Sequence, residues 1–511
     1  MARKKLFFIF LTIAILGTHL SNIWRLRTYP FTDLPNHLAE AYLLRTLTLN
    51  PDDSLGSYYR IDIAPYTPAS LHAVFCALFP DVEIGNKVFY TLCMLLIVGS
   101  LVVLIRAAGG DSWLAFLSTL FFYHLSAMWG LVGYIAGVAT VLFVMVMLVR
   151  YLDRPSFWSA LWLALATLCV YYAHAIAWLF MVACIGSAIL TRRGMEPKYR
   201  WLGLAVIFPG LTLFSLWVMR AEGFENYPPT IPFIISYYRS EYLVSLPRRL
   251  IDIFLYDNNY IATGQLGNIL SLLFTVPVVV WLGWMIYRWR ATSWGLANSS
   301  SRHCGLVFLI VSAVCYLILP NRLPDQFMLF ERMSVFFFLG AIWTLGYLIT
   351  KPLHSLMYAM FLPLLILHAG LWFNYFDDFN RMVQPFQSLL YRASIAQNRT
   401  LGAIIEDYNF RGEPALIHYQ NYQLIWNHAA VPTNIVEYRY RLVTAQPGQT
   451  LPHYEGWITG PADIDILLDH YRNLELLLCH GEYACKASLE TGRYTFAGQR
   501  DGWILWISSH E

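Results

Sequence analysis

The stretch Leu131–Val149, LVGYIAGVATVLFVMVMLV, decides the kind of fold that this chain can adopt. It holds nineteen residues without a charged side chain, and Arg150 follows it directly. A helix rises about 1.5 Å per residue, so this run matches a hydrocarbon core of about 30 Å. The stretch predicts a membrane-spanning helix, and similar runs recur along the chain.

Eleven apolar runs are long enough to be read as spans. The predicted spans are 6–26, 85–105, 112–129, 131–149, 157–173, 175–191, 201–219, 267–287, 304–320, 333–350 and 354–373. The runs 112–149 and 157–191 each hold two spans with almost no loop between them, which predicts tight hairpins. The first run follows Met1–Lys5 and lacks a small-residue cleavage site, so we interpret it as an uncleaved span.

Composition agrees with a chain that lies mostly in lipid. The 511 residues are 57% hydrophobic and 13% charged, with a net charge of +3. The basic residues form short clusters between apolar runs, without the continuous basic face that nucleic acid requires. We therefore exclude nucleic-acid partners and expect the bilayer itself as one.

The basic clusters also predict an orientation. Arg and Lys are concentrated before the first span and in alternate connections, for example at Arg150 and at Arg192–Arg193. By the positive-inside rule these connections and the N-terminus are cytoplasmic. The opposite face then receives the outer loops 27–84, 220–266 and 321–332 and everything after residue 374. The sequence thus predicts a multi-pass protein of a cell membrane with an extracytoplasmic C-terminal domain.

Two domains are expected. Residues 1–375 form the multi-span domain, and residues 376–511, where apolar runs stop, form a soluble α/β domain. Its predicted strands are Ala415–Tyr419, Ile435–Val443, Leu474–Cys479 and Trp503–Ser508, and its predicted helices are Met382–Asp407 and Ala462–Tyr471. Cys479 and Cys485 either form a short disulfide in this exported domain or remain free thiols.

The segment after the first span carries the most informative polar residues. Thr32–His37 reads TDLPNH and opens a helix whose apolar positions suit one that lies in the membrane interface. In one interpretation Asp33 and Pro35 simply cap that helix. In the other, Asp33 is a general base at the membrane surface, with His37 one turn along as its orienting or proton-handling partner.

Further candidates lie at the same predicted face. Tyr66 and His72 belong to the first outer loop, and His124 and His174 stand at the ends of spans. We consider these four as possible substrate-site residues, although a histidine near a helix end is commonly a packing residue.

Arg322 and Arg332 frame the last predicted outer loop. A guanidinium group pairs with two phosphate oxygens at once, so an arginine at a membrane surface suits a lipid-linked phosphate. The alternatives are a lipid headgroup contact or an ion pair between Arg332 and Glu331.

These pieces together resemble the GT-C superfamily of membrane glycosyltransferases. The resemblance rests on the inside N-terminus, an acidic residue after the first span in Thr32–His37, Tyr66–Pro68 before the second span, and the late arginine loop. It implies inverting transfer of a sugar from a polyprenyl-phosphate-linked donor to a saccharide, lipid or protein acceptor, with Asp33 as the base. It also implies a location in the bacterial inner membrane. Many members have a paired acidic motif where this chain has His37.

No cofactor is predicted, and no residue cluster requires a metal, although some GT-C relatives use a divalent ion. Sequence motifs of soluble enzymes, such as phosphate-binding glycine loops and nucleophile elbows, do not occur. Two other functions fit a polytopic chain: a flippase or transporter of lipid-linked saccharides, and a non-catalytic membrane-anchored binding or assembly protein. The spans carry almost no ionisable residues, which disfavours ion-coupled transport.

Overall fold

The computed structural model describes most of the chain. The described residues are 2–220, 230–255, 265–289, 299–322, 328–348, 351–391, 397–433, 441–448, 451–452, 458, 461–490 and 492–509. All structural statements below concern these residues.

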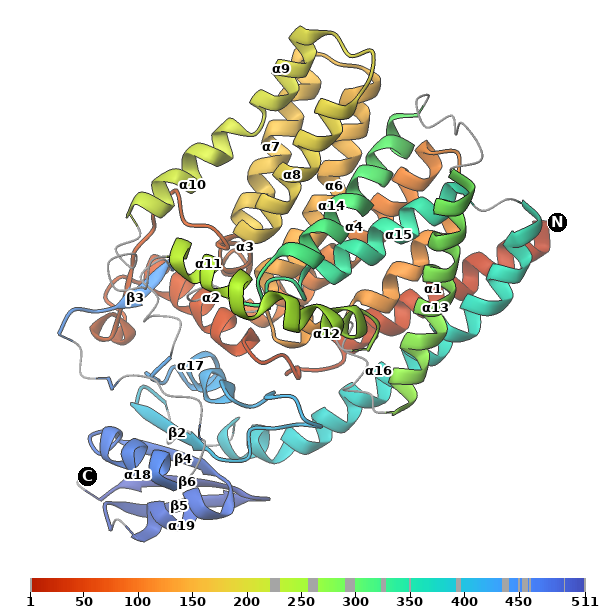
Figure 1. Cartoon of the computed structure of the whole chain (residues 1–511). Coiled ribbons are helices and arrows are strands. Elements are labelled where there is room, and N and C mark those ends of the chain that lie inside the picture. The colour runs from red at the N-terminus through yellow and green to blue at the C-terminus, as the bar shows by residue number, and fades with distance from the viewer. Residues whose placement is uncertain are drawn as a thin grey trace. The chain divides into compact units, whose positions relative to one another are not determined.

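The chain divides into two compact units (Figure 1). The first, here the helical unit, comprises Met1–Ile23, Tyr90–Met128 and Gly133–Asn374. The second, here the mixed unit, comprises Trp24–Phe89, Trp129–Val132 and Tyr375–Glu511. The mixed unit therefore joins the first predicted outer loop to the C-terminal segment. No local sequence pattern indicates this grouping. The predicted domain boundary between residues 375 and 376 stays a prediction.

Helices make up the helical unit. Those that begin in it or cross into it are α1 (Ala2–Trp24), α4 (Val82–Ala107), the 3-10 helix η2 (Ser112–Phe121), α5 (Leu125–Met128), α6 (Val132–Asp153), α7 (Phe157–Ala173), α8 (Ala175–Thr191), α9 (Pro197–Ala205), α10 (Phe208–Arg220), α11 (Thr230–Ser240), α12 (Tyr242–Leu255), α13 (Gln265–Trp289), α14 (Ser300–Ile318), α15 (Met333–Leu348) and α16 (Lys351–Tyr391). Figure 1 shows α6, α7, α8 and α14 running alongside one another.

Among the described residues, five helices are long and apolar enough to cross a membrane. They are Val82–Ala107, Val132–Asp153, Pro197–Met219, Ser300–Ile318 and Ala359–Leu389. Five shorter apolar helices of 10–17 residues are Ser112–Phe121, Phe157–Ala173, Ala175–Thr191, Gln265–Trp281 and Met333–Leu348. A membrane protein with several apolar helices is thus confirmed, whereas the number eleven is not.

The predicted span 112–129 is the clearest difference. It folds as the 3-10 helix η2 followed by the single turn α5, and the Asp111 carboxylate accepts a hydrogen bond from Trp113 N at 3.2 Å to start it. A 3-10 helix of ten residues rises only about 20 Å. The segment is largely buried, and departures from a regular α-helix are tolerated at membrane depth where protein surrounds them.

The second predicted hairpin is present. α7 and α8 are separated only by His174, which ends one helix and caps the start of the next. α7 begins with a capping box in which the Ser156 hydroxyl accepts from Ser159 N at 3.1 Å. On α6, a Cβ at Gly137 would lie 2.6 Å from Ala177 Cβ of α8. Gly137 therefore allows α6 and α8 to pack closely.

Aromatic side chains fill the core of the helical unit. The rings of Phe180 and Phe336 stack with centroids 4.2 Å apart, and those of Phe121 and Phe338 stack at 5.0 Å. Offset stacking of this kind stabilises a core beyond the area it buries. These contacts join α8 and η2 to α15.

The mixed unit is built from segments distant in sequence. Its N-terminal part holds α2 (Leu34–Leu49), the 3-10 helix η1 (Ser54–Ser57), β1 (Tyr59–Ile61) and α3 (Leu71–Ala77). Its C-terminal part holds β2 (Leu401–Ile405), the 3-10 helix η7 (Tyr419–Asn421), α17 (Tyr422–Asn427), β3 (Val443–Ala445), α18 (Pro461–His470), β4 (Leu476–His480), α19 (Glu482–Glu490), β5 (Tyr494–Arg500) and β6 (Trp503–Ser508). β1 pairs antiparallel with β3, which ties the two parts together.

Four strands form a small sheet in the order β2-β4-β6-β5. β2 and β4 run parallel, and the other neighbours are antiparallel (Figure 1). Asp501 and Gly502 connect β5 to β6 with positive φ angles of 43° and 83°. An Asp-Gly pair with this geometry makes the two-residue hairpin turn that matches strand twist.

The sequence predicted part of this unit. The strand at Trp503–Ser508 and, within two residues, the strand at Leu474–Cys479 and the helix at Ala462–Tyr471 are confirmed. Residues 415–418 form a buried turn, and Tyr419 begins η7, where a strand was predicted. The predicted helix Met382–Asp407 is confirmed over 382–391, which belong to α16, but residues 401–405 form β2. Most of the predicted strand 435–443 lies outside the described residues. Cys479 and Cys485 are free thiols.

Helix α2 differs most from its expected setting. We expected it to lie in the membrane interface, yet Leu34, Leu38 and Leu43 are buried together with the polar residues Asn36 and Glu40. The Glu40 carboxylate accepts a hydrogen bond from Leu442 N at 3.0 Å, and burial raises its pKa. α2 is a central helix of the mixed unit, because the C-terminal segment covers its polar side.

Candidate functional site

Asp33 occupies the N-cap position of α2 but does not cap it. Its side chain makes no capping hydrogen bond. Instead, one carboxylate oxygen lies 3.1 Å from Nε2 of His418. The Asp33 side chain is 24% exposed and that of His418 is 6% exposed. A carboxylate that solvent can reach is therefore held by a buried imidazole.

The backbone around Asp33 is fixed by the segment 129–132. Asp33 N donates a hydrogen bond to Trp129 O at 3.0 Å. Gly130 has a positive φ of 72°, and a Cβ there would lie 2.6 Å from the backbone nitrogens of Asp33 and Leu34. With no side chain and a left-handed φ, Gly130 lets the Asp33 backbone come this close.

His418 comes from the buried turn before η7. The neighbouring Tyr419 hydroxyl donates to Thr28 Oγ1 at 2.6 Å, and the Asn421 amide donates to Asn36 Oδ1. These two contacts fasten the turn to the first loop on either side of Asp33. Sequence reasoning missed His418; the only signal was its place in a polar run, His418–Gln423, flanked by apolar residues.

His37, the predicted partner of Asp33, is buried on α2. Its backbone N donates to Asp33 O at 3.2 Å, and its ring lies 6.1 Å from that of His72. The hydrogen-bond partner that the structure gives the Asp33 carboxylate is His418 rather than His37. A catalytic role for His37 stays a hypothesis.

His72 is also fully enclosed. Its Nε2 lies 3.0 Å from Asn86 Oδ1, and its ring meets Phe89 edge-on at 4.9 Å. Burial lowers the pKa of His72 to about 4, because a charged imidazole is poorly solvated there. This setting suits a neutral packing residue, whereas Tyr66 nearby is only half-buried.

A second histidine and carboxylate pair lies in the same unit. Asp53 Oδ1 is 2.7 Å from His428 Nε2, and the Tyr42 hydroxyl is 2.9 Å from His428 Nδ1. Both ring nitrogens are thus engaged, and His428 adopts the left-handed φ of 54° that ends α17. This network holds α17 against α2, and Asp53 Oδ1 also accepts a hydrogen bond from Leu55 N at 3.0 Å, which caps η1.

Arg332 and His174 meet in the helical unit. Arg332 is 3% exposed, and its NH1 lies 3.2 Å from His174 Nε2. His174 Nδ1 accepts from Ile176 N at 3.2 Å, so a neutral ring carries its proton on Nε2. Two donors then face each other over the ring of Tyr134, which lies 5.7 Å from the guanidinium carbon. An anionic oxygen would accept from both donors.

Arg322, the other predicted phosphate ligand, has an exposed side chain. Residues 323–327 of the same loop, including Asp325, lie outside the described part of the chain. The structure therefore separates the two arginines into a buried one beside a histidine and an exposed one.

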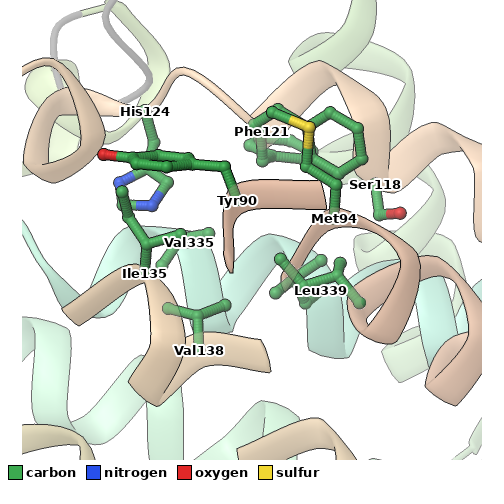
Figure 2. A pocket seen from close by; sticks show the side chains of 11 residues that line it. Tyr90, Met94, Ser118, Phe121, His124, Ile135, Val138, Val335 and Leu339 are labelled. Carbon is green, nitrogen blue, oxygen red and sulfur yellow. The ribbon is translucent and has the colours of Figure 1, made fainter. Parts of the chain in front are cut away.

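His124 lines a small cavity of about 10 Å³ in the helical unit (Figure 2). Figure 2 shows the Tyr90 ring beside the His124 imidazole, with Met94, Ile135 and Leu339 among the apolar walls. This volume holds about one water molecule. The cavity is too small for a sugar, so its geometry does not support His124 as a substrate ligand.

Among the described residues, no group of three or more His, Cys, Asp or Glu side chains could hold a metal ion. A bound divalent ion therefore stays a hypothesis for this chain.

Fold and site together define a helical membrane protein with a small C-terminal sheet and a histidine-paired carboxylate. No protein-family model and no curated protein matches the chain. Among solved structures it is similar to the arabinofuranosyltransferase AftD from mycobacteria, at 12% identity and a TM-score of 0.42. The match covers 99% of this chain and 40% of that chain, so this chain spans less than half of AftD. A TM-score this low does not establish a common fold.

Gly130→Ala should disturb the Asp33 site through the backbone. The left-handed φ and the close Asp33 and Leu34 nitrogens should together cost about 2 kcal/mol or more. We expect a lower unfolding temperature of the purified protein. Gly99→Ala is the control, because nothing lies within 4 Å of a Cβ at that helical position. Equal unfolding temperatures for the two variants would contradict the close approach.

The buried His72 predicts acid sensitivity. Its folded pKa of about 4 lies below the ordinary 6.5, so the unfolded chain binds the proton more readily. Stability is full above pH 6.5 and falls as the pH drops toward 4, by up to about 3 kcal/mol. Unfolding temperatures measured between pH 7 and pH 4.5 should show a weaker pH dependence for His72→Gln than for the wild type. An equal pH dependence for His72→Gln and the wild type would contradict the lowered pKa of His72 in the folded state.

Proposed function

We propose that this chain is a membrane glycosyltransferase that moves a sugar from a polyprenyl-phosphate-linked donor to an acceptor hydroxyl on the extracytoplasmic face. Asp33 is the general base, and His418 is the residue that positions it. The observation that carries the proposal is the 3.1 Å contact between the partly exposed Asp33 carboxylate and the buried His418 ring.

The environment of Asp33 supports this role over a capping role. A capping carboxylate would point at the first backbone N–H groups of α2, but this one points at an imidazole that the C-terminal segment supplies. A hydrogen bond from Nε2–H to one oxygen fixes the carboxylate plane. The second oxygen can then accept a proton from a bound hydroxyl.

The reaction needs one proton acceptor and one site for negative charge. The acceptor oxygen forms a bond to the anomeric carbon while its proton moves to the Asp33 carboxylate. The bond between the anomeric carbon and the donor phosphate oxygen breaks, and the electron pair leaves with the polyprenyl phosphate. Attack opposite the leaving phosphate inverts the anomeric carbon. His418 stays hydrogen-bonded and keeps the carboxylate oriented throughout.

The proposal assigns the donor phosphate to Arg332. Its NH1 lies 3.2 Å from the Nε2 of His174, and burial of the guanidinium strengthens its attraction for a phosphate oxygen. Tyr134 holds the arginine there, because its hydroxyl donates to Arg332 O. Arg322 is exposed and makes no such contact with the described residues, so it is the weaker candidate.

Asp33→Asn should abolish base catalysis while leaving the fold intact. We expect transfer from lipid-linked donors, measured in proteoliposomes, to fall by roughly 10²- to 10⁴-fold. His418→Gln should reduce kcat by about 10- to 100-fold, because a hydrogen bond to a charged group is lost. It should also change the pH profile of kcat, which a purely structural defect would not do.

Asp53→Asn is the matched control for Asp33→Asn. Asp53 also pairs with a histidine in the mixed unit, at 2.7 Å, but the other ring nitrogen of that histidine, His428, contacts the Tyr42 hydroxyl. Unfolding temperatures of all variants would be compared in parallel. Full transfer by Asp33→Asn, or equal loss for the two asparagine variants, would refute the assignment. No transfer by the wild type with any polyprenyl-linked sugar would favour a flippase or a binding protein.

Arg332→Gln and Arg322→Gln separate the two candidate phosphate ligands. If Arg332 binds the donor phosphate, its variant should raise the KM for donor by about tenfold or more, since a charge-assisted hydrogen bond is removed. Arg322→Gln, altered at an exposed position, should leave the KM for donor within twofold. Donor titration of both purified variants measures this. The reverse pattern would move the phosphate site to Arg322.

A further inference from the structure

Helix α12 carries an apolar face that points outward. Leu243, Val244, Leu250 and Ile251 are 75%, 80%, 52% and 55% exposed, and Pro247 between them is also exposed. Their spacing of three, four and seven residues places them on one side of the helix. In a water-soluble protein a continuous apolar face of this kind would favour aggregation.

The opposite face of α12 is polar and packs inward. Ser245, Arg249 and Asp252 face the helical unit, and Arg249 is fully buried. The helix is therefore amphipathic in the inverted sense, because it turns an apolar face outward and buries the polar residues Arg249 and Asp252. This arrangement is stable only if the medium outside is itself apolar.

Arg249 fastens α12 to the end of α14. Its NH1 donates to the carbonyl oxygens of Leu317 and Leu319 at 3.1 and 2.7 Å, and to that of Tyr316 at 3.2 Å. These carbonyls are the unsatisfied C-terminal groups of α14, where the helix dipole is negative. The cation also lies 4.1 Å from the ring centroid of Phe330. The orientation of α12 is thus fixed, so its apolar face cannot simply turn inward.

The neighbouring helix continues the apolar surface. α12 packs against α13, whose window Gln265–Trp281 is apolar, and there Ile269, Leu273 and Val280 are 52%, 52% and 65% exposed. Arg248 stands at the edge of the apolar face of α12, 83% exposed and 3.2 Å from Asp252. A charged residue at such a boundary can reach the lipid headgroups while the apolar residues enter the acyl chains.

We propose that α12 is an in-plane membrane helix that inserts Leu243, Val244, Leu250 and Ile251 among the acyl chains of one leaflet. At fourteen residues, with Arg248, Arg249 and Asp252 in its length, it is too short and too polar to cross the bilayer. Its partner is the phospholipid bilayer, which also surrounds the exposed side of α13. This inference is independent of the glycosyltransferase proposal.

Lipid photo-crosslinking tests the inference on the full chain. Benzoylphenylalanine would replace Leu243 in one variant and Ile251 in another, and each protein would be reconstituted in vesicles of phosphatidylethanolamine and phosphatidylglycerol. Both positions point outward, so the larger side chain should not disturb packing. Leu273 of α13 is the positive control, and the exposed Arg472 of the mixed unit is the negative control.

After illumination, mass spectrometry should find phospholipid adducts at positions 243, 251 and 273, at least tenfold more abundant than at position 472. Adducts at 273 without adducts at 243 and 251 would overturn the inference. A crosslink from 243 or 251 to a second copy of the chain, in place of lipid, would also overturn it and identify a protein interface. Gel filtration of each variant confirms that the folded protein was tested.

Discussion

The mixed unit depends on polar contacts between two segments that are almost 400 residues apart. β1 pairs with β3, the Asn36 amide oxygen accepts from Asn421, and the Asp33 carboxylate meets His418. A buried polar group costs free energy unless a partner satisfies it, so α2 can keep Asn36 and Glu40 inside only while the C-terminal segment covers them. The candidate site exists because of the same constraint, since Asp33 and His418 come from the two sides of this contact.

The helical unit follows the opposite rule on its outer surface. Apolar side chains point outward on α12 and α13. The buried Arg249 donates hydrogen bonds to carbonyl oxygens at the C-terminal end of α14. Both features are expected where the surrounding medium is hydrocarbon, because exposed apolar groups then cost nothing and exposed backbone carbonyls cost several kcal/mol each. The two units therefore differ in which side chains they bury and which they expose. In both units, tertiary contacts decide this, and the local sequence pattern does not.

Periodic features of the sequence predicted their structures well. The apolar run at Leu131–Val149 became α6, and the predicted hairpin around His174 is present. The β5–β6 hairpin also has a local signal, because Asp501–Gly502 is a dipeptide that favours two-residue hairpin turns. The prediction of a helix in the membrane interface was wrong for α2, which is buried, whereas α12 has the features of such a helix. Helical periodicity shows that a helix has two different faces, but it does not show which medium each face contacts.

The sequence by itself determined that the chain is a helical membrane protein. The length of an apolar run and its lack of charged residues are local properties, and they decide whether a helix can cross the bilayer. It also singled out Asp33, through the contrast of a carboxylate with the apolar span before it. Only the tertiary structure decided that His418 rather than His37 meets Asp33, that Gly130 admits the Asp33 backbone, and that Arg332 rather than Arg322 is buried beside a histidine. These outcomes depend on which distant segments pack together, and no local pattern encodes a contact between positions 33 and 418.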